Sequence, residues 1–140
     1  MQKTNRVEKE GSIIAAIKNK KPVKKIHDAI DQDSIKALLE LDDGTENSFL
    51  KDMISVFFKD APKLIGQLDD ALQKKDSLLF ARTAHTLKST CANLGALTMS
   101  KLCEQLEMIS SNGGFNHVLE KIIIVKKEFK KVRAALETYL

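Results

Sequence analysis

The chain has 140 residues, a formal net charge of +4 and 43% hydrophobic residues. Its length fits one domain, which can bury about two thirds of the surface of its unfolded chain. No apolar run approaches the roughly 20 residues that cross a bilayer, and residues 1–6 are not followed by the apolar core of a signal peptide. We therefore expect a cytoplasmic protein without a membrane span.

The first part of the chain differs in character from the rest. Over residues 1–32 lysines are concentrated around Pro22, and there is little periodic apolar content. We interpret this segment as a basic linker or flexible N-terminal arm, followed by a folded domain at residues 33–140. Basic segments attract nucleic acid and anionic lipid. Because no aromatic stacking surface accompanies these lysines, we predict no nucleic-acid partner.

The first predicted helices follow the arm. A short helix over residues 33–41 is closed by an Asp-Asp-Gly sequence, and a second helix starts near the capping residue Thr45. Pro62 lacks an amide hydrogen but is tolerated in a first helical turn. We therefore predict that Pro62 separates a helix ending near Asp60 from one running to about Lys75.

Asp76 is predicted to cap the next helix, and Gly95 to end it in a left-handed conformation. Apolar residues recur in this helix at spacings of three and four, and these residues are Phe80, Ala84, Leu87, Cys91 and Leu94. At about 100° per residue, His85 lies about 140° from that apolar stripe and Lys88 about 80° from it. His85 is therefore predicted to face solvent, with Lys88 at the flank of the stripe.

Two further helices complete the predicted fold. Residues 96–110 form one helix, residues 112–114 form a turn, and the last segment is a long amphipathic helix. Its apolar positions are Phe115, Val118, Ile122, Val125, Phe129, Val132 and Leu136. Residues 122–125 belong to this helix rather than to a strand, because the helical spacing continues on both sides. We predict an all-α fold: an antiparallel four-helix bundle with one or two short accessory N-terminal helices.

The cysteines and the other histidines show no metal-binding pattern. Cys91 lies on the apolar stripe and Cys103 in the next helix, without a Cys-x-x-Cys pair. We predict buried reduced thiols rather than a disulfide or a zinc site. His27 and His117 lack a partner acid, cysteine or second histidine at useful spacing, and we interpret both as solvated surface residues. No metal or other cofactor is predicted for this chain.

A histidine on a polar helix face is most often only a solvated side chain, but the neighbours of His85 indicate more. Its face is shared with Ala81, Lys88, Ser89 and Ala92, so only the lysine could shade the imidazole. Neutral imidazole keeps a nitrogen lone pair and is a competent nucleophile and general base. If His85 received a phosphoryl group, carrying about two negative charges, Lys88 could offset that charge.

The residues after Ala84 follow the pattern Ala-His-x-Leu-Lys-small-x-x-x-x-Leu-Gly-Ala, and a helix with Leu, Cys and Leu-Glu comes next. The matching residues are Ala84, His85, Leu87, Lys88, Ser89, Leu94, Gly95, Ala96, Leu102, Cys103, Leu106 and Glu107. At these positions the chain resembles the histidine-containing phosphotransfer (HPt) domains of bacterial multistep phosphorelays. The resemblance covers roughly residues 33–140. Ser89 departs from it, because many members carry glycine there, and we expect slightly more crowding at the site.

This resemblance implies a phosphorelay intermediate. A receiver-domain aspartate would pass a phosphoryl group to the distal nitrogen of His85, Lys88 would help hold the transferred oxygens, and a second receiver would take the group onward. The implied partners are response-regulator receiver domains, which carry magnesium, and a hybrid sensor histidine kinase in cis or in trans; we expect a monomer. With no glycine-rich phosphate loop and no paired carboxylates near His85, we predict no ATP site and no autonomous enzyme activity.

Docking residues are predicted from position alone. They are Ala81, Arg82, Ser89 and Ala92 around the histidine, together with Lys63 and Gln67 on the neighbouring helix. The alternative function is a non-phosphorylated helical docking scaffold for a signalling protein. A scaffold would work equally well with His85 replaced, whereas His85 beside Lys88 and small residues is what phosphoryl transfer requires.

Overall fold

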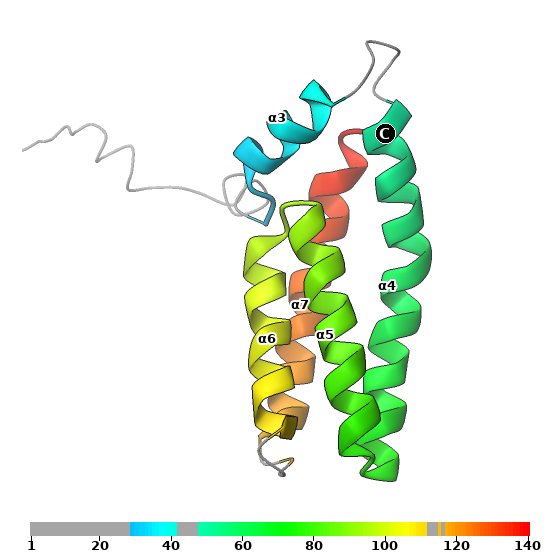
Figure 1. Cartoon of the computed structure of the whole chain (residues 1–140), viewed down its shortest axis with the longest axis vertical. Coiled ribbons are helices and arrows are strands. Elements are labelled where there is room, and N and C mark those ends of the chain that lie inside the picture. The colour runs from blue at the N-terminus through cyan, green and yellow to red at the C-terminus, as the bar shows by residue number, and fades with distance from the viewer. Residues whose placement is uncertain (1–28, 42–47, 112–114, 116) are drawn as a thin grey trace, which may run out of the picture.

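The computed structural model describes residues 29–41, 48–111, 115 and 117–140. The helices are α3 (Gln32–Glu40), α4 (Ser48–Lys74), α5 (Ser77–Asn93), α6 (Leu97–Ser111) and α7 (Val118–Glu137). The last four run alternately down and up as an antiparallel bundle, and α3 lies across one end of it (Figure 1). The predicted all-α bundle is confirmed, with one accessory helix among the described residues. No described helix is both long and apolar enough to span a membrane.

Each long helix buries one apolar stripe in a common core. Side chains no more than 2% exposed include Leu50, Ile54, Phe57 and Leu68 from α4, Met99, Cys103 and Leu106 from α6, and Val118, Ile122, Val125, Val132 and Leu136 from α7. The whole predicted stripe ending at Leu94 is buried as well. On α7, Ile122 is buried whereas Ile123 and Ile124 are 45% and 47% exposed, a helical pattern that excludes a strand there. Full burial of a Val, Leu, Ile, Phe or Met side chain contributes about 1.5–3 kcal/mol to the stability of the folded state.

The predicted helix break at Pro62 is wrong. Residues on both sides of Pro62 belong to the single helix α4, and Pro62 itself lies on its exposed side. A proline inside a helix removes one hydrogen bond and costs about 3 kcal/mol. However, Ala61, Ile65 and Leu68 continue the buried stripe beyond the proline. Because their packing depends on an uninterrupted helix, burial of this stripe offsets the local cost.

Both ends of α5 match the prediction. The Asp76 side chain accepts a hydrogen bond from the Leu79 amide at 3.1 Å and caps the first turn. At the other end Gly95 has φ +79°, a left-handed conformation that ends the helix. The last helix starts later than predicted, at Val118, and Phe115 precedes it with its ring edge-on to Phe80 at 5.6 Å between centroids.

The bundle also includes residues that the sequence analysis placed in the basic arm. Ala29 and Ile30 are each 2% exposed and belong to the core, because burial of two apolar side chains favours their packing. The Asp31 amide then donates to the Gly95 carbonyl at 2.8 Å, which ties the start of α3 to the α5–α6 turn. Outside the described residues lie residues 1–28 of the predicted arm, the predicted helix start at Thr45 and the predicted turn at residues 112–114.

Replacement of Gly95 by alanine should destabilise the fold. A Cβ at this position would lie 2.7 Å from the Ser34 Cβ, and the backbone has φ +79°. We expect a loss of about 1–3 kcal/mol in the free energy of unfolding, measured by urea denaturation. Gly66→Ala is the matched control, since nothing lies within 4 Å of its added Cβ in the interior of α4. The control should gain about 0.5–1 kcal/mol; equal effects of the two substitutions would contradict this account.

Candidate functional site: a histidine beside a shared carboxylate

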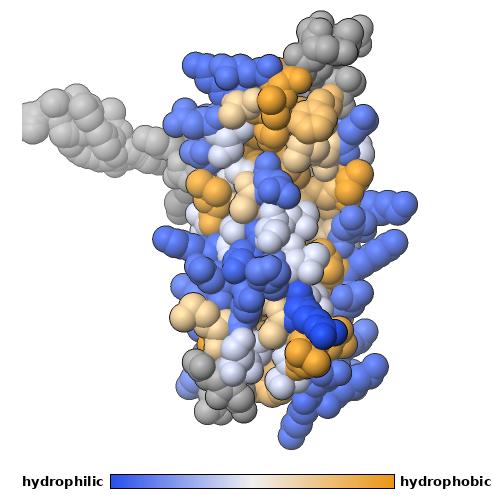
Figure 2. All heavy atoms as spheres, viewed as in Figure 1, coloured by the Kyte–Doolittle hydropathy of each residue, from blue (hydrophilic) through white to orange (hydrophobic). Residues whose placement is uncertain are grey.

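His85 lies near the middle of α5, on the side away from the core. Its side chain is 58% exposed, whereas the adjacent Ala84 is fully buried. The predicted outward orientation is therefore confirmed. Figure 2 shows near-neutral side chains over the upper part of α5 in this view, and strongly hydrophilic ones below them and along the flanks. His85 is thus presented on a surface that another macromolecule can approach.

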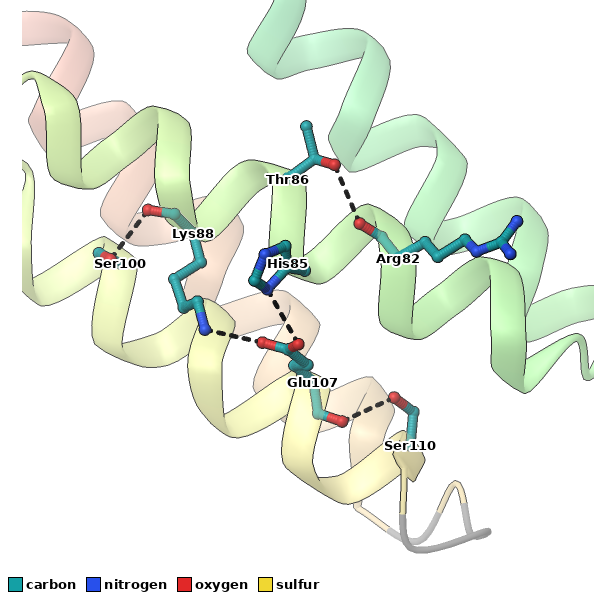
Figure 3. A network of polar contacts seen from close by, with 7 residues as sticks. All are labelled: Arg82, His85, Thr86, Lys88, Ser100, Glu107 and Ser110. Carbon is teal, nitrogen blue, oxygen red and sulfur yellow. Dashed lines mark hydrogen bonds and ion pairs between the residues drawn. The ribbon is translucent and has the colours of Figure 1, made fainter.

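A carboxylate from the next helix contacts both polar residues of the predicted site. Glu107 of α6 places Oε2 3.0 Å from His85 Nδ1 and Oε1 2.9 Å from Lys88 Nζ, so one carboxylate bridges the two α5 side chains (Figure 3). Among the residues on its own face of α5, only Lys88 was expected to shade the imidazole, and a single carboxylate contributed by the next helix was not predicted. Lys88 points to Glu107, and Glu107 contacts the imidazole.

The signal that identifies Glu107 lies in the hairpin formed by α5 and α6. His85 is 11 residues before Ala96 and Glu107 is 11 residues after it. In an antiparallel helix pair, residues equidistant from the turn come to the same level. Helical periodicity within α5 gives no information about this pairing, because the pairing depends on where the turn lies.

The charges of the bridge reinforce one another. The hydrogen bond from Lys88 holds the pKa of the Glu107 carboxyl below its ordinary value, and His85 adds to the effect. The same hydrogen bond to Glu107 raises the pKa of Lys88. Glu107 is therefore ionised and Lys88 protonated at neutral pH. Both side chains are 26% exposed, so solvent screens the interaction in part.

An ionised carboxylate accepts hydrogen bonds and donates none, so the proton of this contact belongs to His85 Nδ1. When the ring is neutral, its lone pair is then on Nε2, the distal nitrogen. The contact also fixes the plane of the ring, in the way that a carboxylate orients an imidazole in other reactive sites. The arrangement yields an exposed imidazole with one nitrogen occupied and the other available as a nucleophile.

A polar contact across the helix pair supports this register. The Ser100 hydroxyl of α6 donates to the Lys88 carbonyl of α5 at 2.9 Å, beside the bridge. Within α6, the Ser110 hydroxyl donates to the Glu107 carbonyl at 3.0 Å. Behind the site, Cys91 and Cys103 are both buried, and neither forms a disulfide. Their mutual hydrogen bond, followed by burial, raises the pKa of the Cys91 thiol.

The predicted docking residues do not form one cluster. Ser89 and Ala92 are exposed and line a groove beside Lys88, whose opposite wall on α6 includes Leu97, Lys101 and Glu104. The α6 wall was not predicted. Ala81 is half-buried, and Arg82 is exposed with its guanidinium directed away from His85 in Figure 3. On α4, Lys63 is exposed and Gln67 accepts a hydrogen bond from Thr83 at 3.4 Å. Their role in docking stays a prediction.

Of the other two histidines, the structure describes His117, which has no contact with His85 among the described hydrogen bonds and ion pairs. His117 is exposed at the start of α7, and its Nδ1 lies 3.5 Å from Glu120, an acidic partner that we had not predicted. His27 lies outside the described residues. Within the described ranges, no three His, Cys, Asp or Glu side chains gather closely enough to hold a metal ion.

Several known proteins are similar in sequence to this chain. Multistep phosphorelay regulator 1 of Schizosaccharomyces pombe is 35% identical over 59% of this chain, which covers 28% of that protein. Pseudo histidine-containing phosphotransfer protein 1 of rice is 26% identical over 71% of this chain, which covers 54% of that protein. The chain therefore spans about half the length, or less, of these two relatives. Neither is bacterial, so the similarity extends beyond the bacterial domains named above.

A solved structure shares the fold. Histidine-containing phosphotransfer protein B of Pseudomonas aeruginosa superposes with a TM-score of 0.72 and 24% identity, over 79% of this chain and 92% of that one. Residues 52–135, more than half of the chain, match the family model described as the Hpt domain. These residues include most of α4, all of α5 and α6, and the His85–Glu107–Lys88 bridge between them. The chain belongs to the Hpt domain family.

Proposed function

We propose that this chain is a phosphorelay intermediate, which accepts a phosphoryl group from a receiver-domain aspartate onto His85 and passes it to another receiver. The observation that carries this proposal is the hydrogen bond between His85 Nδ1 and the Glu107 carboxylate at 3.0 Å. It assigns the ring proton to Nδ1 and leaves the nucleophilic lone pair on Nε2 of an imidazole that is 58% exposed. Membership of the Hpt domain family supports it.

The transfer step follows from this geometry. The Nε2 lone pair attacks phosphorus in line, the Nε2–P bond forms, and the bond from phosphorus to the donor carboxylate oxygen breaks. That carboxylate departs with the electron pair. The imidazole, which keeps its Nδ1 proton, becomes a cation beside the ionised Glu107. Onward transfer reverses these changes, so the chain supplies positioning and charge, while the receiver supplies its magnesium and the rest of the catalytic groups.

Lys88 serves the phosphorylated state in this proposal. Its ammonium lies 2.9 Å from Glu107 next to the imidazole, on a long side chain that can rotate toward a phosphoryl group. A phosphoryl group at pH 7 carries about two negative charges and forms strong charge-assisted hydrogen bonds. Lys88 would therefore exchange part of its contact with Glu107 for the transferred oxygens.

The partners in this proposal are response-regulator receiver domains and a hybrid sensor histidine kinase, with the chain acting as a cytoplasmic monomer without an ATP site of its own. A docking scaffold is the second candidate. The similarity to a protein named a pseudo histidine-containing phosphotransfer protein favours it. An imidazole with an assigned nucleophilic nitrogen favours the relay, because a scaffold needs no such nitrogen.

Replacement of His85 by glutamine separates the two candidates. The purified protein and the His85→Gln variant are incubated with magnesium and a panel of phosphorylated receivers, and their intact masses are measured before and after acid treatment. We expect one acid-labile, alkali-stable phosphoryl group on the wild type and none on the variant. Because His85 is exposed, the His85→Gln substitution should change the free energy of unfolding of the protein by less than about 0.5 kcal/mol. A folded wild type that accepts nothing from any receiver would favour the scaffold.

Lys88→Ala tests the charge that we assign to the phosphorylated state. We expect phosphoryl transfer to slow, or the phosphohistidine lifetime to shorten, by about five- to tenfold, without loss of folding. Lys101→Ala is the matched control, because Lys101 lies on the wall of the same groove and its replacement removes an equal charge. If Lys88→Ala keeps the wild-type transfer rate and phosphohistidine lifetime, as Lys101→Ala should, Lys88 has no role at the site.

A further inference from the structure

The proton on Nδ1 decides whether a phosphorylated His85 can act as a donor. When Nε2 carries phosphorus and Nδ1 carries a proton, the ring is a cation, and cleavage of the Nε2–P bond releases neutral imidazole. If Nδ1 has lost its proton, the same cleavage must release an anionic ring, which is a much poorer leaving group. A donor that works at neutral pH and above therefore needs a group that keeps this proton in place.

We infer that Glu107 is a positioning residue for onward transfer, whose negative charge retains the Nδ1 proton of phosphorylated His85. This inference rests on the proposed function. The Glu107 carboxylate already accepts the Nδ1 proton at 3.0 Å. This hydrogen bond joins α5 to α6, and the hydrogen bond from Ser100 to the Lys88 carbonyl supports the register of the same two helices. No proton then has to enter or leave the ring in either direction of transfer.

The other charged groups near the ring do not replace Glu107. On α5, Arg82 and Lys88 lie one turn before and after His85, and both are cations that would oppose a protonated ring. On α6, Glu104 acts on Lys88 through its charge and has no contact with His85 among the described hydrogen bonds and ion pairs. On α4, the neutral Gln67 contacts Thr83 of α5, and Lys63, one turn before Gln67, is a further cation. Among the described residues, Glu107 is the carboxylate that contacts the ring.

Glutamine at position 107 separates charge from orientation. Its amide oxygen can accept the same Nδ1–H hydrogen bond, so the ring keeps its plane and its nucleophilic Nε2. Only the negative charge is lost. Since that charge favours the protonated ring, the phosphorylated variant loses its Nδ1 proton at a lower pH than the wild type. For a contact of this kind at an exposed site we expect a displacement of about one pH unit.

The experiment follows loss of the phosphoryl group as a function of pH. The full-length wild type, Glu107→Gln and Glu104→Gln are phosphorylated with phosphoramidate, transferred to buffers between pH 5 and pH 9, and followed by intact mass. We expect the Glu107→Gln profile to lie about one unit lower, so that phosphoryl loss at pH 8 is about tenfold slower while the rates converge at pH 5. Glu104→Gln removes an equal charge from α6 and should differ from the wild type by less than about twofold at every pH.

The possible outcomes are distinct. A Glu107→Gln profile that overlies the wild type, or that is slowed by one constant factor at every pH, overturns the inference; the second result would indicate relief of repulsion between Glu107 and the phosphoryl group. An equal displacement of the Glu104→Gln profile also overturns the inference. Any negative charge on this surface would then retain the Nδ1 proton, without contact with the ring. Absence of phosphohistidine in the wild type would overturn the proposed function, and the inference with it.

Discussion

The packing of α6 against α5 is the constraint on which the site depends. The left-handed Gly95 ends α5, and the chain returns after one tight turn, so every later residue of α6 has a fixed level on α5. A shift of one residue along this pair would move Glu107 about 1.5 Å along the axis and about 100° around it. The carboxylate would then no longer reach both His85 and Lys88. The chemistry of an exposed histidine is thus determined by a buried interface.

The site combines this rigid base with weakly held side chains. The bridge lies at the outer edge of the core, where Lys88 and Glu107 are each 26% exposed. In such a setting an ion pair contributes little to the stability of the fold. Exchange of partners among the three side chains therefore costs the bundle little, and the phosphorylation that we propose would leave the helices undisturbed. Most of the stability of the fold comes from burial of the apolar stripes, which do not include His85, Lys88 or Glu107.

What could be predicted from the sequence was local. The three- and four-residue spacing of apolar residues was enough to predict that Leu87 is buried and His85 exposed. The capping residues Asp76 and Gly95 were enough to predict the ends of α5. The contact with Glu107 joins residues 22 positions apart and depends on the register of two helices, which periodicity within one helix does not report. Pro62 was misjudged for a related reason, because its local preference was outweighed by packing along the whole of α4.

The two thiols behind the site bear on how the protein tolerates oxidants. Cys91 and Cys103 are 0% exposed, and the Cys91 thiol is held in its protonated, unreactive form. An oxidant can reach them only when α5 and α6 separate, an event that requires the core itself to open. Oxidative damage at these sulfurs therefore proceeds no faster than opening of the bundle. In the proposed function, the imidazole on the outer side of the same helix pair would exchange its phosphoryl group while the sulfurs stay protected.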